Sequence, residues 1–206
     1  LGCAYIETDV QLSSDGIPYI FHDDDLSRLL GKDVAFNSLH SSEIQNLKLF
    51  ESFDIPTLET ALTTFPDALF QIDLKTDEVA IPAMKIIETL EAFDRVCIAS
   101  FSSKRLTLIN EMYPHVCLSM GPKEILKLLL ASYGLYKKKV PGNCLQVPIY
   151  QYGIKLVTKR FIQYVQNIGL KIHVWTINDK NQMQQLINLG VDGIITDRPK
   201  ALKDLL

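Results

Sequence analysis

The sequence predicts an α/β fold built on a parallel β-sheet and favours a (β/α)8 barrel that is short of one strand. Short apolar or alternating runs bounded by turn residues alternate with segments of helical periodicity. Many of these runs are nearly continuous in apolar residues, as in parallel sheets covered on both faces. Seven main strands fit into the 206 residues, whereas a complete barrel has eight strands and typically about 250 residues. A doubly wound sheet is the other arrangement that this pattern allows.

The predicted strands are short and bounded by turn residues. An additional arm, residues 17–23, is expected to form a hairpin with the first strand through the turn Ser14-Asp15-Gly16. The seven main strands are predicted at residues 4–12, 69–75, 96–101, 115–121, 144–150, 171–178 and 192–197.

Five helices are predicted between the strands, because apolar residues recur every three or four positions there. Gly169 and Gly190 supply C-terminal stops for the last two. The leucine-rich third helix could touch a membrane, but we interpret it as a core-facing helix whose following lysines complement its dipole. The helices are predicted at residues 78–93, 102–113, 122–135, 158–168 and 179–189.

Composition indicates one domain spanning residues 1–206, since 47% hydrophobic residues can supply one substantial core. A net charge of −3 argues against a broad basic surface for nucleic acid. Stable membrane insertion is not expected, because no segment reaches the roughly 20 apolar residues of a membrane span. Four cysteines without CxxC spacing are interpreted as core residues in a reducing, cytoplasmic location, and the oligomeric state is left open. They are Cys3, Cys97, Cys117 and Cys144.

Carboxylates gather on one face of the first predicted strand. Successive side chains of a strand alternate between its faces, so Glu7 and Asp9 point the same way while Val10 points to the other side. Two carboxylates about 7 Å apart repel each other unless a cation or a proton lies between them. Mg2+ and Ca2+ prefer such oxygen ligands.

The same phase returns in the second main strand, within "QIDLK". Asp73 and Lys75 share one face there. Three carboxylates could hold a divalent ion while Lys75 provides a charge for a phosphate oxygen. Each acidic pair taken alone is more typical of a solvated or ion-paired edge. Their shared phase on two strands of one barrel favours a metal site.

Two further residues, one titratable and one aromatic, are candidates for functional roles. His22 ends the hairpin arm and could transfer a proton to a leaving alkoxide, with an adjacent Asp fixing its tautomer, or it could be an ordinary surface residue. Trp175, near the end of a strand, could be a substrate-stacking wall or a core plug. Structural roles in the last strand and its turn are expected for Asp192, Thr196 and Asp197.

Several motifs together resemble the glycerophosphodiester phosphodiesterase family. They occur in the family's order as "YIETDVQLSSDGIPYIFHDDDL", "IPTLETAL", "FQIDLK", "SF", "HVWTIN" and "GVDGIITDRP", and they cover nearly the whole chain. The resemblance implies a TIM barrel with a small hairpin insertion after the second strand. It also implies divalent-metal-dependent hydrolysis of small glycerophosphodiesters, such as glycerophosphocholine or glycerophosphoethanolamine, to glycerol 3-phosphate and an alcohol.

The resemblance also implies roles for single residues. Asp73 stands where the family has Glu, which shortens the reach by one methylene, so a water could complete the coordination. Lys75 would contact phosphate. By their matching positions, the implied metal ligands are Glu7, Asp9 and Asp73, the implied catalytic histidine is His22, and Trp175 resembles a lining wall of the substrate pocket.

One departure concerns the start of the chain. The family has an H-R-G motif with a second catalytic histidine, followed by P-E-N, and we expect both motifs and the first strand to precede Leu1. The alternative is a truncated, inactive relative that only binds a phospholipid headgroup or a sugar phosphate. A second enzymatic alternative is a sphingomyelinase-D-like lyase acting on intact lipids, whose hydrophobic entrance could only be residues 125–135.

Overall fold

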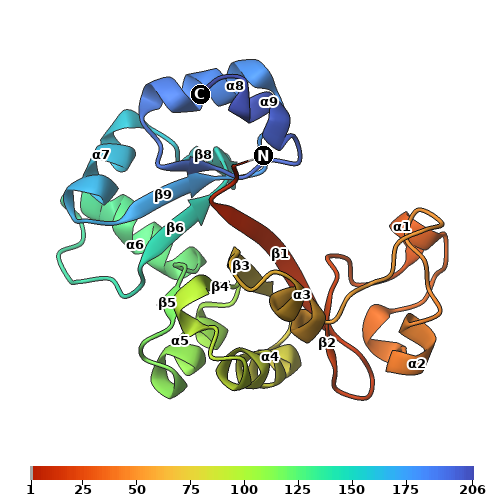
Figure 1. Ribbon diagram of the computed structural model, residues 1–206. Coiled ribbons are helices and arrows are strands. Elements are labelled where there is room, and N and C mark those ends of the chain that lie inside the picture. The colour runs from red at the N-terminus through yellow and green to blue at the C-terminus, as the bar shows by residue number, and fades with distance from the viewer. Residues whose placement is uncertain (1) are drawn as a thin grey trace. The chain divides into compact units, whose positions relative to one another are not determined.

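The structure, a computed structural model, describes residues 2–206 and is an α/β fold (Figure 1). The chain divides into two compact units. The N-terminal unit consists of residues 4–117, and the C-terminal unit consists of residues 118–206, with which residues 2 and 3 are grouped. The strand–helix alternation predicted from the sequence is present in both units.

Five strands form one sheet that begins in the N-terminal unit, in the order β2-β1-β3-β4-β5. β1 runs parallel to β3, and β3 runs parallel to β4, whereas β2 is antiparallel to β1. The hairpin predicted through Ser14-Asp15-Gly16 is thereby confirmed. The strands are β1 (Tyr5–Leu12), β2 (Pro18–Ile20), β3 (Leu69–Leu74), β4 (Val96–Ala99) and β5 (Cys117–Leu118).

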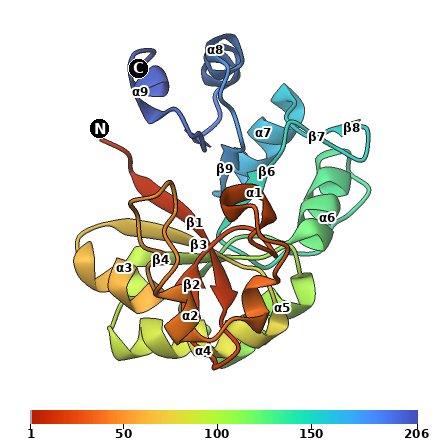
Figure 2. The same ribbon diagram turned by 90° about the vertical axis from the view of Figure 1, so that its right-hand side faces the viewer.

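The longer helices of this unit begin at hydroxyl-bearing caps. Thr57, Thr76 and Ser102 each accept a hydrogen bond from the backbone N–H three residues on, which satisfies one donor of the first helical turn. Figure 2 shows α4 and α5 on the same side of the sheet. These helices are α3 (Leu58–Thr64), α4 (Asp77–Thr89) and α5 (Ser103–Met112), and a 3-10 turn, η2 (Phe93–Arg95), follows α4.

Residues between β2 and α3 form a small lobe with a core of its own. Phe21 and Phe36 stack at a ring-centroid distance of 4.5 Å, and Tyr19 meets Phe36 edge-on. The sequence of the lobe has no long stretch in which apolar residues recur at helical or strand spacing, so its short helices were not predicted. They are α1 (Ser27–Leu30), η1 (Phe36–Ser38) and α2 (Ser41–Ile44).

The C-terminal unit contains a parallel sheet in the order β10-β9-β6. Gly190 has φ 81° and ends α8, as predicted. The strands are β6 (Cys144–Val147), β9 (Lys171–Val174) and β10 (Gly193–Ile194). The helices are α6 (Pro122–Ser132), α7 (Lys159–Asn167), α8 (Lys180–Leu189) and α9 (Pro199–Lys203).

The strand predicted at residues 144–150 was too long. β6 ends at Val147, directly before Pro148, which has no N–H to donate to a strand ladder. A separate antiparallel hairpin follows instead, formed by β7 (Tyr150–Gln151) and β8 (Ile154–Lys155).

The structural roles predicted near the C-terminus are confirmed. The Asn178 side chain accepts from the Thr196 hydroxyl and donates to the Asp197 carboxylate. Asp192 accepts from the Lys171 ammonium and the Ile172 N–H. Partial burial favours the protonated form of Asp192, but these hydrogen bonds prevail and lower its pKa.

Two further features bear on the sequence predictions. No disulfide joins the four cysteines of residues 2–206, and Cys97 and Cys144 are buried, as predicted for core residues. Cys117 is only partly buried and Cys3 is exposed, so the prediction of a core position was wrong for Cys3. Among residues 2–206, none of the helices has the length and apolar character needed to cross a membrane.

Arg105 connects three elements at the carboxyl end of the sheet. Its guanidinium donates to the Leu74 carbonyl oxygen at 2.5 Å, to the Ser100 hydroxyl at 2.6 Å and to Asp77 at 2.9 Å. The side chain is only 9% exposed, so water does not readily replace these bonds. Arg105 therefore fixes the end of β3, immediately before Lys75.

Replacing Arg105 with Ala is expected to lower the free energy of unfolding by about 2–3 kcal/mol, because charge-assisted hydrogen bonds are lost and buried acceptors are left unpaired. Chemical denaturation monitored by circular dichroism measures the effect. The neighbouring exposed Lys104→Ala variant is the control, and an equal loss in both variants would contradict the role of Arg105.

Candidate active site

The parallel register of β1 and β3 brings acidic side chains together. Asp9 lies opposite Asp73, and Glu7 lies opposite Gln71 two residues earlier. Since every second residue of a strand faces the same side, these four side chains project from one face of the sheet. The shared face predicted from the sequence is confirmed.

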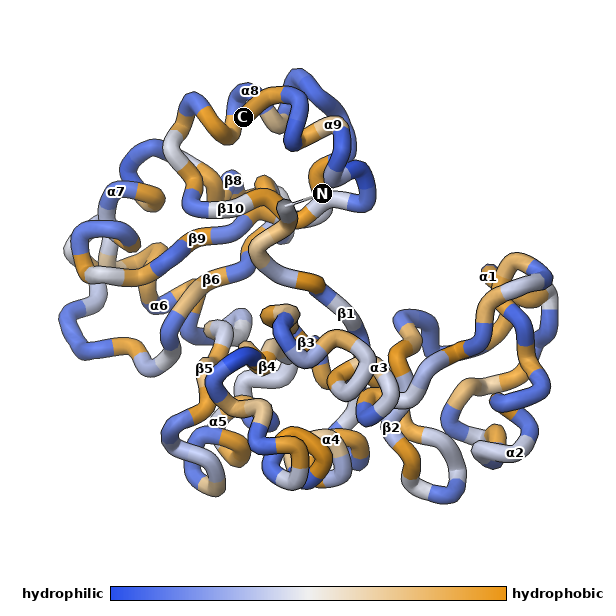
Figure 3. The backbone as a smooth tube through the Cα atoms, in the orientation of Figure 1, coloured by the Kyte–Doolittle hydropathy of each residue, from blue (hydrophilic) through white to orange (hydrophobic). Residues whose placement is uncertain are grey.

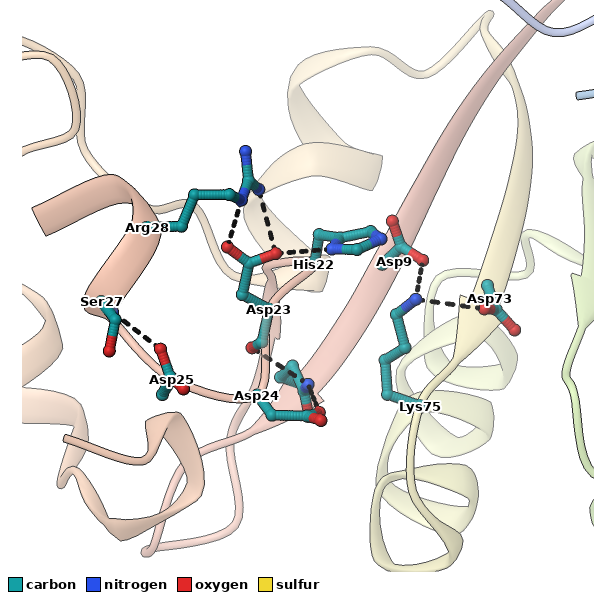
Figure 4. Close-up of polar contacts among 10 residues, drawn as sticks. Asp9, His22, Asp23, Asp24, Asp25, Ser27, Arg28, Asp73 and Lys75 are labelled. Carbon is teal, nitrogen blue, oxygen red and sulfur yellow. Dashed lines mark hydrogen bonds and ion pairs between the residues drawn. The ribbon is translucent and has the colours of Figure 1, made fainter. Parts of the chain in front are cut away.

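Lys75 lies between the two aspartates (Figure 4). Its ammonium nitrogen is 2.5 Å from Asp9 Oδ1 and 3.4 Å from Asp73 Oδ2. Its backbone N–H donates to the Val10 carbonyl oxygen at 3.3 Å, which extends the β1–β3 pairing by one residue. The three charged side chains are 8–17% exposed. Burial alone would lower the pKa of Lys75, but the hydrogen bonds and charges of Asp9 and Asp73 outweigh it and raise the pKa.

The single positive charge of Lys75 compensates only part of the negative charge of Glu7, Asp9 and Asp73. Loss of hydration raises the pKa of Glu7 to about 7, with further contributions from Asp9 and Asp73, although the residue as a whole is still exposed. Burial also raises the pKa of Asp73, against the lowering effect of Lys75. A cation near these groups would favour their charged forms.

The donor set is compatible with a divalent cation. Three carboxylates offer the oxygen ligands that Mg2+ and Ca2+ prefer. Asp73 Oδ1 is one of two buried side-chain polar atoms in residues 2–206 that have no hydrogen-bond partner. The carboxylate oxygens of Glu7, Asp9 and Asp73 are not grouped within 4.8 Å of one another, and Lys75 supplies part of the positive charge between them. The residue types fit a divalent ion, because carboxylate oxygens are its preferred ligands. In this structure Lys75 supplies the positive charge beside Asp9 and Asp73.

His22 extends from the lobe toward this cluster. The Phe21 N–H donates to the Asp9 carbonyl oxygen at 3.0 Å, which holds the chain before His22 against β1. The imidazole Nδ1 is 2.6 Å from Asp23 Oδ1. Figure 4 shows the opposite edge of the ring facing Asp9 and Lys75. With Nδ1 paired to Asp23, the other ring nitrogen is left for proton transfer.

Arg28 holds the carboxylate that orients His22, and the sequence interpretation missed it. Its guanidinium donates to both oxygens of Asp23, at 2.7 and 2.9 Å. The hydrogen bonds from Arg28 lower the pKa of Asp23 despite partial burial, and the bond to His22 adds to the effect. The only sequence signal was a basic residue shortly after "HDDD", within a helix too short to predict.

Gln11 connects the loop that contains His22 and Asp23 to β1. Its amide nitrogen donates to the Asp23 carbonyl oxygen at 3.2 Å and to Asp24 Oδ1 at 3.1 Å. Gln11 follows Glu7 and Asp9 on the same strand face and is only 2% exposed. The position of His22 is therefore fixed by polar contacts as well as by the aromatic lobe core.

Trp175 belongs to the C-terminal unit, directly after β9. Its backbone N–H donates to the Val147 carbonyl oxygen at 3.1 Å, and the residue is half-buried. Its role in lining a substrate pocket remains a prediction.

Comparisons with known proteins agree with the family resemblance. Residues 1–201 match the model of the glycerophosphoryl diester phosphodiesterase family. The chain is 33% identical to a probable glycerophosphodiester phosphodiesterase 2 of Mycobacterium tuberculosis, covering 100% of this chain and 80% of that protein. It is 30% identical to a glycerophosphodiester phosphodiesterase of Bacillus altitudinis, covering 98% and 86%.

The structural comparison concerns the fold. A phosphodiesterase of Oleispira antarctica, solved in complex with the product sn-glycerol-3-phosphate, superimposes with a TM-score of 0.81 at 21% identity, covering 99% of this chain and 85% of that one. Such neighbours have TIM-barrel-like α/β folds. The family match and the sequence relatives together show that the chain belongs to the glycerophosphoryl diester phosphodiesterase family and is an enzyme of that class.

Proposed function

We propose that the protein hydrolyses small glycerophosphodiesters, such as glycerophosphocholine or glycerophosphoethanolamine, to glycerol 3-phosphate and an alcohol, with Mg2+ or Ca2+ as cofactor. The observation that carries this proposal is the cluster of buried Asp73 with partly buried Asp9 and Lys75, toward which His22 points. A phosphodiester needs positive charge at its oxygens and a proton donor at its leaving group. This cluster offers groups for both.

The carboxylates of Glu7, Asp9 and Asp73 would hold the divalent ion. When bound, the ion would polarise a phosphate oxygen and offset the charge that develops during phosphoryl transfer. Lys75, whose pKa is raised by its acidic neighbours, stays charged and would share the phosphate's negative charge as a compact point charge.

His22 would exchange a proton with the oxygen of the reacting phosphodiester. Asp23, held by Arg28, fixes Nδ1 as the protonated nitrogen, so the nitrogen on the side facing the cluster is the one that gives or takes the proton. The family pattern calls for a second histidine as its acid–base partner.

We infer that residues 1–206 belong to one phosphodiesterase domain of the (β/α)8-barrel class with a small hairpin insertion, and that Trp175 lines the substrate pocket. We also infer a cytoplasmic location, which the lack of a disulfide among the four cysteines of residues 2–206 supports.

Replacing His22 with Ala in the full-length protein is expected to lower kcat by about 10²-fold or more, because general acid–base catalysis contributes at least that much. Steady-state hydrolysis of glycerophosphocholine measures it. His115→Ala, which alters an exposed histidine outside the cluster, is the control. Turnover by the His22 variant close to that of the control would rule out the assignment.

Removing divalent ions with a chelator is expected to abolish turnover, and adding Mg2+ or Ca2+ should restore it. Asp73→Asn should prevent the restoration, whereas Asp73→Glu, which keeps the charge, should retain part of it. Asp67→Asn, an exposed residue before β3, serves as the matched control. Full activity of the chelated protein would refute the metal requirement.

Replacing Asp23 with Ala is expected to lower kcat by about 10-fold or more with little change in KM. His22 then loses its orientation, so it supplies only part of the roughly 10²- to 10⁴-fold contribution of general acid–base catalysis. Nitrogen-15 NMR of the labelled histidines should show that the Nδ1-protonated tautomer of His22 is lost in the same variant. Asp25→Ala, which removes only a bond to the Ser27 N–H, is the control. An unchanged tautomer would contradict the positioning role.

A further inference from the structure

Helix α6 is apolar on its exposed side as well as on its buried side. Ile125, Leu128 and Ala131 are buried, which confirms the predicted core-facing stripe. Leu126, Leu130 and the following Tyr133 are 52%, 38% and 56% exposed. The spacing i, i+4, i+7 places these three on one outer stripe of the helix. Figure 3 shows α6 coloured largely as hydrophobic, although a surface helix ordinarily has a polar outer face.

Positive charge is concentrated in the same part of the chain. Residues 122–160 contain eight of the 21 basic residues of the chain and one of its 24 acidic residues, Glu124. Lys137, Lys138 and Lys139 follow the end of α6 after a four-residue connection, and all three are exposed. A chain with a net charge of −3 thus contains a strongly basic segment.

The hairpin of β7 and β8 adds exposed aromatic surface. Tyr152, at its tip, is 94% exposed, and Tyr150 and Ile154 are 58% and 51% exposed. Tyr152 has φ 50° and Gly153 has φ 78°. The first turn position with positive φ favours Asn, Asp or Gly over a bulky aromatic residue. Neither packing nor turn geometry explains the tyrosine.

A contact joins the end of α6 to the start of α7, which follows the hairpin. The Arg160 guanidinium lies 4.7 Å from the centre of the Tyr133 ring. The Lys155 ammonium lies over the Tyr150 ring at 5.9 Å. Two cation–ring contacts thus lie within the segment from α6 to α7. We call the exposed residues of this segment, 122–160, the basic-apolar surface.

We propose that the basic-apolar surface docks the protein on membranes that contain anionic phospholipids. Leucine and tyrosine side chains can enter the boundary between headgroups and acyl chains, while lysines on flexible stems stay at the headgroup level. Juxtaposed lysines and arginines are attracted by an anionic leaflet. An acidic protein surface would match the charge but not the leucine stripe and exposed tyrosines. Docking on a lipid surface requires no membrane-spanning helix.

Sedimentation of the full-length protein with vesicles tests this proposal without reference to catalysis. We expect binding to vesicles of phosphatidylcholine with about one-third phosphatidylserine, and at least about 10-fold weaker binding to phosphatidylcholine alone, because the anionic headgroups supply the attraction. High salt should weaken the binding through screening. No preference for the anionic vesicles would overturn the proposal, as would binding only to RNA or acidic protein.

Two variants separate the contributions of charge and apolar contact. Replacing Lys137, Lys138 and Lys139 with Glu should weaken vesicle binding at least about 10-fold. The control variant changes the net charge equally by replacing Lys180, Lys200 and Lys203 with Glu, and it should not weaken binding to this extent. Tyr152→Ser should weaken binding while turnover of glycerophosphocholine in solution stays unchanged. Equal losses in both triple variants would show non-specific attraction and refute a defined docking surface.

Discussion

The in-register parallel pairing of β1 with β3 is the constraint on which the candidate active site depends. A shift of one residue would turn every side chain of a strand to the opposite face. The register is held from the other face, where Val10, Ile72 and Leu74 are completely buried. The same alternation that hides these apolar groups therefore brings Asp9 beside Asp73. Hydrophobic packing determines where the charges lie.

A second set of interactions acts on the histidine. The lobe has a small aromatic core, and its loop is tied to β1 by Gln11 and by the Phe21 N–H. Arg28 and Asp23 then orient the ring. The strands provide rigid positions for the carboxylates, whereas the imidazole stands on a loop whose position requires several polar bonds.

The sequence was sufficient to predict the features that depend on periodicity. The two-residue alternation in "YIETDVQL" and "FQIDLK" predicted the common face of Glu7, Asp9, Asp73 and Lys75, and the predicted hairpin and five helices are present. Arg28 and Arg105 could not be predicted, since their partners are set by tertiary packing. The strand predicted through residue 150 was too long because the prediction followed the apolar run across Pro148, which cannot donate to a strand ladder.

The position of Lys75 between Asp9 and Asp73 has a consequence for how the chain folds. Many metal sites consist only of ligands, and their proteins do not fold until the ion arrives. Here the lysine ammonium already offsets part of the carboxylate repulsion, and the raised pKa of Glu7 allows that group to carry a proton near neutral pH. If the proposed ion binds there, the strands would not need it in order to pair, and folding would not depend on the supply of metal.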